Sequence, residues 1–234
     1  MESLARSIIG WMSTSFGTFM SAALLLKAGH FIEECCFQKY VWIGGISAVH
    51  GVLMKLVLCG MGSKAVVSEG ILLSLLAGGL LAAAYMDAEK CWVYNYVWWW
   101  CLLSEILLFI VRIWKCGGMS ATDVPGNLFI RQLGSFIIFV MLQHFLFEKM
   151  YGKADCYAFC ICALAESIYG GGLFLFLLHM LIAVMLMAIV QIYRKNLMWN
   201  GKLRKPGAFI PYIVVAFWII MLQQCSIVAA HNYA

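Results

Sequence analysis

Two aspartates at the ends of apolar segments are the residues of this chain best suited to chemistry. Asp87 closes the apolar segment 82–86, and Asp155 follows the short polar segment 151–154. An ionised carboxylate at membrane depth needs a partner, water or a proton, so an acid there indicates a functional site. Two such acids, each opening or closing a helix, predict a catalytic pair.

Two carboxylates held within a few ångströms of each other cannot both ionise at low cost, so they share one proton. The charged carboxylate then activates a water while the protonated one polarises a carbonyl. This is peptide hydrolysis without a metal or a covalent intermediate. The chain offers no comparable alternative, because it has no His-Glu-x-x-His motif, no serine in a nucleophile elbow, and five scattered histidines.

The elements that must position these acids are membrane helices. Hydrophobic residues make up 64% of the chain and charged residues 12%, and the mean hydropathy is +0.91. Runs of roughly 20 apolar residues cross the hydrocarbon as helices. The fold class expected is therefore an all-α integral membrane protein, a polytopic bundle of about eight transmembrane helices. The predicted spans are 7–26, 41–60, 68–86, 97–114, 128–147, a short one at 155–169, 171–193 and 207–229.

Glycines predict two features of the packing. Gly170-Gly171-Gly172 predicts a tight turn that separates the sixth span from the seventh. Gly44-Gly45 together with Gly51 predicts close helix packing in the N-terminal part of the chain.

Positive charges in the short loops set the expected orientation, because Lys and Arg are retained on the cytoplasmic side. One set of loops between the spans holds ten of them and the opposite set holds four. The ten are Lys27, Lys39, Lys90, Lys149, Lys153, Arg194, Lys195, Lys202, Arg204 and Lys205. This places Asp87 and Asp155 at the cytoplasmic face of the plasma membrane and both termini outside. The net charge of +5 suits anionic lipid headgroups, and no basic face with interleaved aromatic residues indicates nucleic acid.

The ten cysteines do not form a metal-binding pattern. Cys35 and Cys36 are adjacent, Cys160 and Cys162 are one residue apart, and no Cys-x-x-Cys motif occurs. Most of the cysteines lie in apolar spans, where they act as small packing residues. We therefore expect neither a metal nor a cofactor.

The residues after Asp87 resemble the first active-site motif of type IV prepilin peptidases. In that family an aspartate ends a helix and is followed, six to eight residues later, by an aliphatic residue, commonly a proline, and an asparagine. Val93, Tyr94 and Asn95 take these places here. Tyr94 thus stands where many members have proline.

The residues around Asp155 and the start of the last span complete the resemblance. Gly152, Ala154 and Asp155 are similar to the second motif, Gly-x-Gly-Asp, with alanine in place of the second glycine. Tyr157 stands where many members place a lysine. The segment 205–212, which contains Pro211, is similar to the proline-containing approach to the last helix of the family.

The resemblance implies an aspartic-type endopeptidase with Asp87 and Asp155 as its dyad. The substrate would be the short basic leader of a prepilin or pseudopilin, removed at the cytoplasmic face for type IV pilus assembly or protein secretion. It also implies a six-helix peptidase core, residues 67–234, preceded by two N-terminal transmembrane helices, residues 1–66. The loop 27–40 lacks the paired Cys-x-x-Cys motifs of the large members, so the chain is similar to a short form without the zinc-binding loop.

Simpler roles remain open for several of these residues. Glu89 and Glu148 flank the aspartates and could attract a basic leader, or they could be solvated loop residues. Asp87 could be a hydrated interfacial acid and Asp155 a helix N-cap. Asn95 could hold the first loop or cap the fourth helix.

Other polar residues in the spans keep a second class of function open. Glu105 lies in the middle of the fourth span, Lys55 within the second, and His144 near the end of the fifth. Intramembrane ionisable groups can line an ion or proton path, so the alternative is a small transporter or channel subunit. Glu105 could instead pair with Arg112 on the same helix face or lie beside the active-site water. A presenilin-like intramembrane protease is a third hypothesis, because it shares the Gly-x-Gly-Asp logic.

Overall fold

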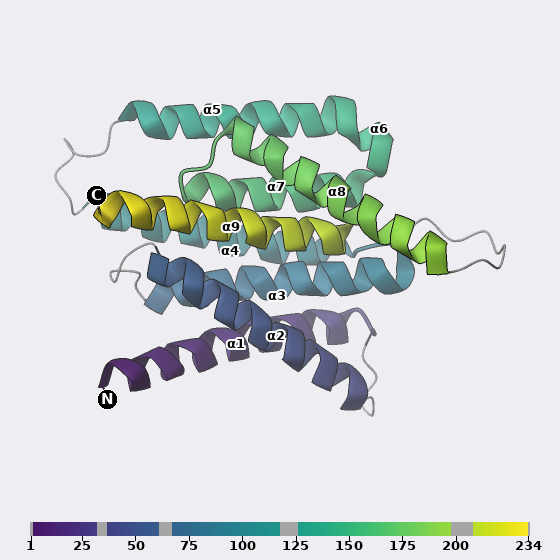
Figure 1. The fold of residues 1–234 in the computed structure, drawn as a ribbon, viewed down its shortest axis with the longest axis horizontal. Coiled ribbons are helices and arrows are strands. Elements are labelled where there is room, and N and C mark those ends of the chain that lie inside the picture. The colour runs from purple at the N-terminus through teal and green to yellow at the C-terminus, as the bar shows by residue number, and fades with distance from the viewer. Residues whose placement is uncertain (1, 32–36, 61–66, 118–125, 198–207, 234) are drawn as a thin grey trace.

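The computed structural model describes residues 2–31, 37–60, 67–117, 126–197 and 208–233, and these ranges are helical apart from short turns, with no strand (Figure 1). A helix occupies each of the eight predicted spans, which confirms the all-α class. The helices are α1 (Glu2–Ala28), α2 (Phe37–Gly60), α3 (Val67–Lys90), α4 (Asn95–Gly117), α5 (Gly126–Leu142), α6 (Glu148–Tyr151), α7 (Lys153–Ile168), α8 (Leu173–Leu197) and α9 (Ile210–Tyr233), with a π-helical turn, η1 (Gln143–Phe147), between α5 and α6.

Four of the described helical segments are long and apolar enough to cross a membrane. They are Ser68–Lys90, Asn95–Arg112, Gln132–Tyr151 and Leu173–Tyr193. The helix α7 has 16 residues, fewer than the roughly 20 that cross the hydrocarbon, in agreement with the short sixth span expected from the sequence. The fifth span was predicted to end at residue 147, but the helical path continues through η1 and α6 to Tyr151.

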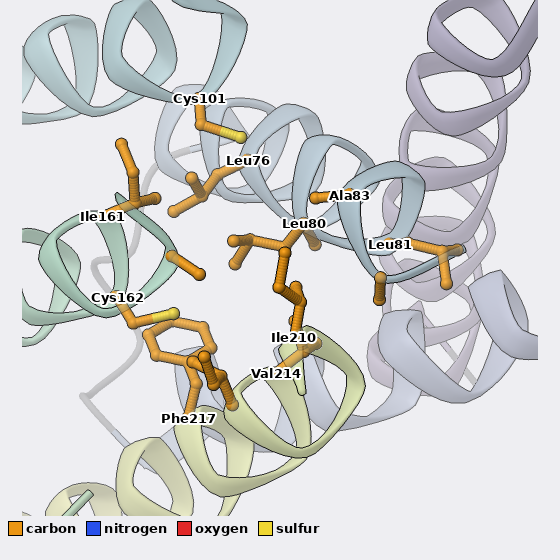
Figure 2. Close-up of a cluster of buried hydrophobic side chains, with 14 of the residues drawn as sticks. Leu76, Leu80, Leu81, Ala83, Cys101, Ile161, Cys162, Ile210, Val214 and Phe217 are labelled. Carbon is orange, nitrogen blue, oxygen red and sulfur yellow. The ribbon is translucent and has the colours of Figure 1, made fainter. Parts of the chain in front are cut away.

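The helices α3, α7 and α9 share the core of the bundle. The helix α3 packs against α1, α2, α4 and α9, and α7 packs against α4, α5, α8 and α9. Figure 2 shows Leu80 of α3, Cys162 of α7 and Val214 of α9 converging on one apolar cluster. Because these side chains are buried together, the ends of the same three helices are held in a fixed relation to one another.

Close approach between helices depends on small residues. A Cβ atom added at Gly78 of α3 would lie 2.7 Å from the backbone oxygen of Thr18 on α1. At Gly51 of α2 it would lie 3.0 Å from the Cα of Ser15, whereas at Gly45 it would meet nothing within 4 Å. The predicted close packing is therefore confirmed at Gly51 and is wrong at Gly45. The N-terminal helices pack directly on the rest of the bundle.

The turn predicted at residues 170–172 is present between α7 and α8. Gly170 has a φ of +100°, a conformation that side chains with a Cβ rarely adopt. The N–H of Gly171 donates to the carbonyl oxygen of Glu166 at 2.8 Å, and a Cβ at Gly171 would lie the same 2.8 Å from that oxygen. This turn reverses the chain, so that α7 and α8 are separate helices.

Candidate active site

Asp87 lies in the last turn of α3 and is buried, with 6% of its surface exposed. Its backbone oxygen accepts a hydrogen bond from the N–H of Cys91 at 2.8 Å, and Cys91 has a φ of +55°, so the chain leaves the helix there. The side-chain Oδ2 of Asp87 accepts the N–H of Ile210 at 2.9 Å. The N–H of Phe209 also bonds to the carboxylate.

These two donors belong to the start of α9. The first N–H groups of a helix have no partner within the helix and carry a partial positive charge. A carboxylate placed there receives both hydrogen bonds and a favourable dipole. The segment around Pro211 therefore serves the site through its backbone, by presenting the N–H groups of Phe209 and Ile210 to Asp87.

Asp155 is the third residue of α7 and is partly buried. The N-cap position belongs to Gly152, which makes no side-chain cap, so the N-cap alternative for Asp155 is wrong. Gly152 has a φ of +105°, which explains why a glycine begins the second motif. Ala154 keeps an ordinary negative φ, so its side chain strains nothing where the family has its second glycine.

The structure brings the two aspartates close enough to interact. Asp155 precedes the apolar part of α7 and lies outside the four candidate spans. Burial raises the pKa of Asp155 to about 7, and the negative charge of Asp87 contributes to the same shift. A carboxyl with this pKa holds its proton for much of the time at neutral pH while its neighbour is charged. Proton sharing between the two aspartates stays a prediction, and the raised pKa of Asp155 is in its favour.

Three aromatic side chains, Tyr151, Phe159 and Phe209, pack together near the two aspartates and form what we call the aromatic wall. The ring of Tyr151 is centred 5.7 Å from the ring of Phe159 and 5.7 Å from that of Phe209, and the last two are 5.8 Å apart. The hydroxyl of Tyr151 donates to Oε1 of Gln143 at 2.8 Å. Gln143 is buried at the start of the π-helical turn. Sequence reasoning missed these residues, and the position of Tyr151 beside Gly152 was the one available signal.

The tail of the first motif connects the site to the N-terminal helices. Val93 is buried, and Asn95 is exposed as the first residue of α4. The ring of Tyr94 is centred 6.1 Å from that of Phe31, which follows α1, and it stacks on Tyr96 at 5.4 Å. Phe31 and Tyr94 therefore join the end of α1 to the loop that follows Asp87.

The two flanking acids are already paired with cations of the chain. Lys39 Nζ lies 3.2 Å from Oε1 of Glu89. His144 Nδ1 lies 2.9 Å and Lys153 Nζ lies 3.6 Å from the carboxylate oxygens of Glu148. A basic leader would have to share these acids with the cations that they already hold.

The polar residues of the transporter hypothesis lie apart. Glu105 is fully buried against α7, near the backbone of Ala165. Arg112 lies 4.0 Å from Glu69 of α3, so the expected pairing of Arg112 with Glu105 is wrong. His144 is 67% exposed and paired with Glu148. The side chain of Lys55, like Cys35, Cys36 and the charges of loop 198–207, lies outside the described residues.

Comparison of the chain with family models, curated proteins and solved structures found no match. The resemblance to prepilin peptidases therefore depends on the residues around the two aspartates.

Proposed function

We propose that this protein is a membrane-embedded aspartic endopeptidase that removes the short basic leader from prepilins or pseudopilins. The observation that carries the proposal is that Asp87 and Asp155 lie at the same end of the bundle, where burial and the charge of Asp87 raise the pKa of Asp155 to about 7. Two carboxylates that share a proton in a partly water-excluded site are the requirement of this chemistry.

The surroundings of each acid suggest its role. Asp87 accepts a hydrogen bond from the N–H of Ile210 at the start of α9, and such a donor stabilises the negative charge of a carboxylate, so we assign Asp87 as the base that activates a water. Asp155, whose pKa is raised to about 7, is protonated in a large share of the molecules at neutral pH and in that form polarises the scissile carbonyl. Proton transfer from the water to Asp87 and from Asp155 to the carbonyl oxygen gives a tetrahedral intermediate. The pair again holds one proton when this intermediate has formed.

The location proposed for this chemistry is the cytoplasmic face of the plasma membrane, in a multi-pass protein. Four helices with the length and composition of membrane spans support insertion. Asp87 at the end of α3, Asp155 at the start of α7 and Ile210 at the start of α9 lie at one end of the bundle. The excess of Lys and Arg in the loops at this end favours the cytoplasm. A leader that precedes a hydrophobic helix would reach the dyad there.

The transporter alternative has less support. It requires Glu105 and His144 in one pathway, but the first is fully buried against α7 and the second is 67% exposed and paired with Glu148.

The bundle exposes large apolar side chains on its outer helices, and contact with lipid would suit them.

The test is processing of a prepilin from the same genome, co-expressed with the protein and followed on a gel by loss of the leader. Asp87→Asn and Asp155→Asn should each abolish processing while the protein remains inserted and abundant. Glu89→Gln is the comparison variant: it removes a nearby acid other than the two aspartates, so it should weaken leader binding at most and should not abolish processing. Processing that survives both aspartate variants would exclude the aspartyl mechanism, and no processing by the wild type would favour the transporter.

A further inference from the structure

A buried histidine of α8 joins α7 and α9 in the core of the bundle, at Glu166 near the end of α7 and at Ile213 near the start of α9. His179 of α8 is 1% exposed, and its Nδ1 lies 2.7 Å from Oε1 of Glu166 on α7. Its Nε2 lies 2.9 Å from the carbonyl oxygen of Ile213 in the first turn of α9. The ring of His179 and the carboxylate of Glu166 are both inside the core, where an unpaired polar group is costly.

The proton positions follow from the partners. A backbone carbonyl only accepts hydrogen bonds, so the Nε2 of His179 carries a proton and donates it to Ile213. The Nδ1 atom lies 2.7 Å from Oε1 of Glu166, a distance at which the two atoms would share one further proton, whichever of them holds it. With that proton, His179 and Glu166 together carry no net charge, and His179 contacts both α7 and α9.

These two helices carry the two halves of the site. The helix α7 bears Asp155 in its first turn, and α9 presents the N–H groups of Phe209 and Ile210 to Asp87. Ile213 lies one turn beyond Ile210, so a bond to its carbonyl fixes the height and rotation of the start of α9.

The aromatic wall fills the space between the histidine and the dyad. The ring of Phe159 is centred 5.5 Å from that of His179 and 5.8 Å from that of Phe209. A displacement of His179 would therefore reach Phe209 through packed rings as well as through Ile213.

We propose that His179 is a positioning residue of the peptidase, which holds the first turn of α9 against α7 so that the N–H groups of Phe209 and Ile210 stay on Asp87. The inference rests on the proposed function for its catalytic consequence, but the geometry that it assigns to α9 does not depend on catalysis. The bond that matters for the dyad is the one from Nε2 to Ile213, whereas the bond from Nδ1 to Glu166 contributes to stability.

Two substitutions separate the two bonds. In His179→Gln the amide nitrogen can reach the place of Nε2 and donate to Ile213, while Glu166 loses its partner. In His179→Asn the amide nitrogen can reach the place of Nδ1 and donate to Glu166, while the bond to Ile213 is lost. We expect His179→Asn to be the more stable variant and the less active one.

The measurements are leader cleavage, thermal unfolding in detergent and chemical labelling of Asp87. Cleavage by His179→Asn should fall roughly tenfold or more, as expected when a charged carboxylate loses hydrogen bonds. His179→Gln should stay within about threefold of the wild type and unfold at a lower temperature. Labelling of Asp87 by a carbodiimide and an amine, read by mass spectrometry, should increase in His179→Asn and not in His179→Gln.

The labelling of Asp87 separates the proposed peptidase activity from the proposed positioning role of His179. If the wild type cleaves no prepilin, the peptidase proposal fails, and increased labelling of Asp87 in His179→Asn still supports the hold of His179 on α9. If His179→Gln is both the less stable variant and the less active one, cleavage simply follows stability. That result would overturn the inference and leave His179 a purely structural residue. Equal labelling of Asp87 in both variants would overturn it as well.

Discussion

Replacing Asp155 by asparagine should stabilise the folded protein at pH 8 and leave its stability unchanged at pH 4. Folding raises the pKa of this carboxyl from its ordinary value of 3.8 to about 7, through burial first and the charge of Asp87 second. The folded protein therefore binds this proton more tightly than the unfolded chain does. By linkage, its stability falls as the pH rises from about 4 to about 7.

The size of the effect follows from the shift. A rise from 3.8 to about 7 corresponds to about 4 kcal/mol at roughly 1.36 kcal/mol per pH unit. Asp155 is partly exposed, and water screens part of its interactions, so we expect about half of this, roughly 2 kcal/mol, above pH 7. Below about pH 4 the aspartic acid is neutral in both states, and asparagine offers no advantage.

The assay is thermal unfolding in detergent, followed by tryptophan fluorescence at pH 4, 6 and 8, for the wild type and Asp155→Asn. The gain at pH 8 should be roughly 5 °C and should vanish at pH 4. Glu89→Gln is the control, because its exposed pair with Lys39 is worth less than about 1 kcal/mol at either pH. A gain that does not change with pH, or a loss of stability at pH 8, would refute the electrostatic description of the dyad.

Three further predictions follow from the site and the packing. Leader cleavage should decline as the pH rises through about 7, because Asp155 then loses the shared proton; a pH–rate profile that is flat from pH 6 to 9 would contradict this. Gly152→Ala should cost about 1–2 kcal/mol in unfolding experiments, since its φ is +105°, and should reduce cleavage through the displaced start of α7. Gly78→Ala should lower the free energy of unfolding by about 1–3 kcal/mol in chemical denaturation, because its Cβ would lie 2.7 Å from the Thr18 oxygen. Gly45→Ala should be neutral or stabilising, because a Cβ there would meet nothing within 4 Å. Equal effects of the two substitutions would argue against the packing of α1 on α3.

The helices and their breaks could be predicted from the sequence because both depend on local chemistry. Apolar runs between charged loops predicted a helix at each of the eight spans, and three consecutive glycines predicted the turn after α7. The same local chemistry identified Asp87 and Asp155 as acids at helix ends. The positive φ of Gly152 was not predicted, although glycine adopts it more readily than residues with a Cβ do.

The partners of the buried polar residues could not be predicted in this way. A helix-face argument offered Arg112 as the partner of Glu105, but Arg112 lies near Glu69 on another helix. Glu89 and Glu148 were predicted to attract a leader or to be solvated loop residues, yet Glu89 pairs with Lys39 and Glu148 with Lys153. These ion pairs depend on which helices lie next to each other in the bundle. The periodicity of apolar residues along one helix does not indicate its neighbours, so the pairs could not be predicted.

The sequence by itself determined the helices of this chain, their apolar character and the two acids that could do chemistry, because hydropathy and backbone preference act over a few residues. The tertiary structure decided how those acids are held. Asp87 receives its hydrogen bond from Ile210, a residue 123 positions away, and His179 ties the helix of Ile210 to that of Asp155. These contacts arise from the packing of α3, α7, α8 and α9 around one core. Side-chain volume and buried hydrogen bonds select that packing over the whole chain at once.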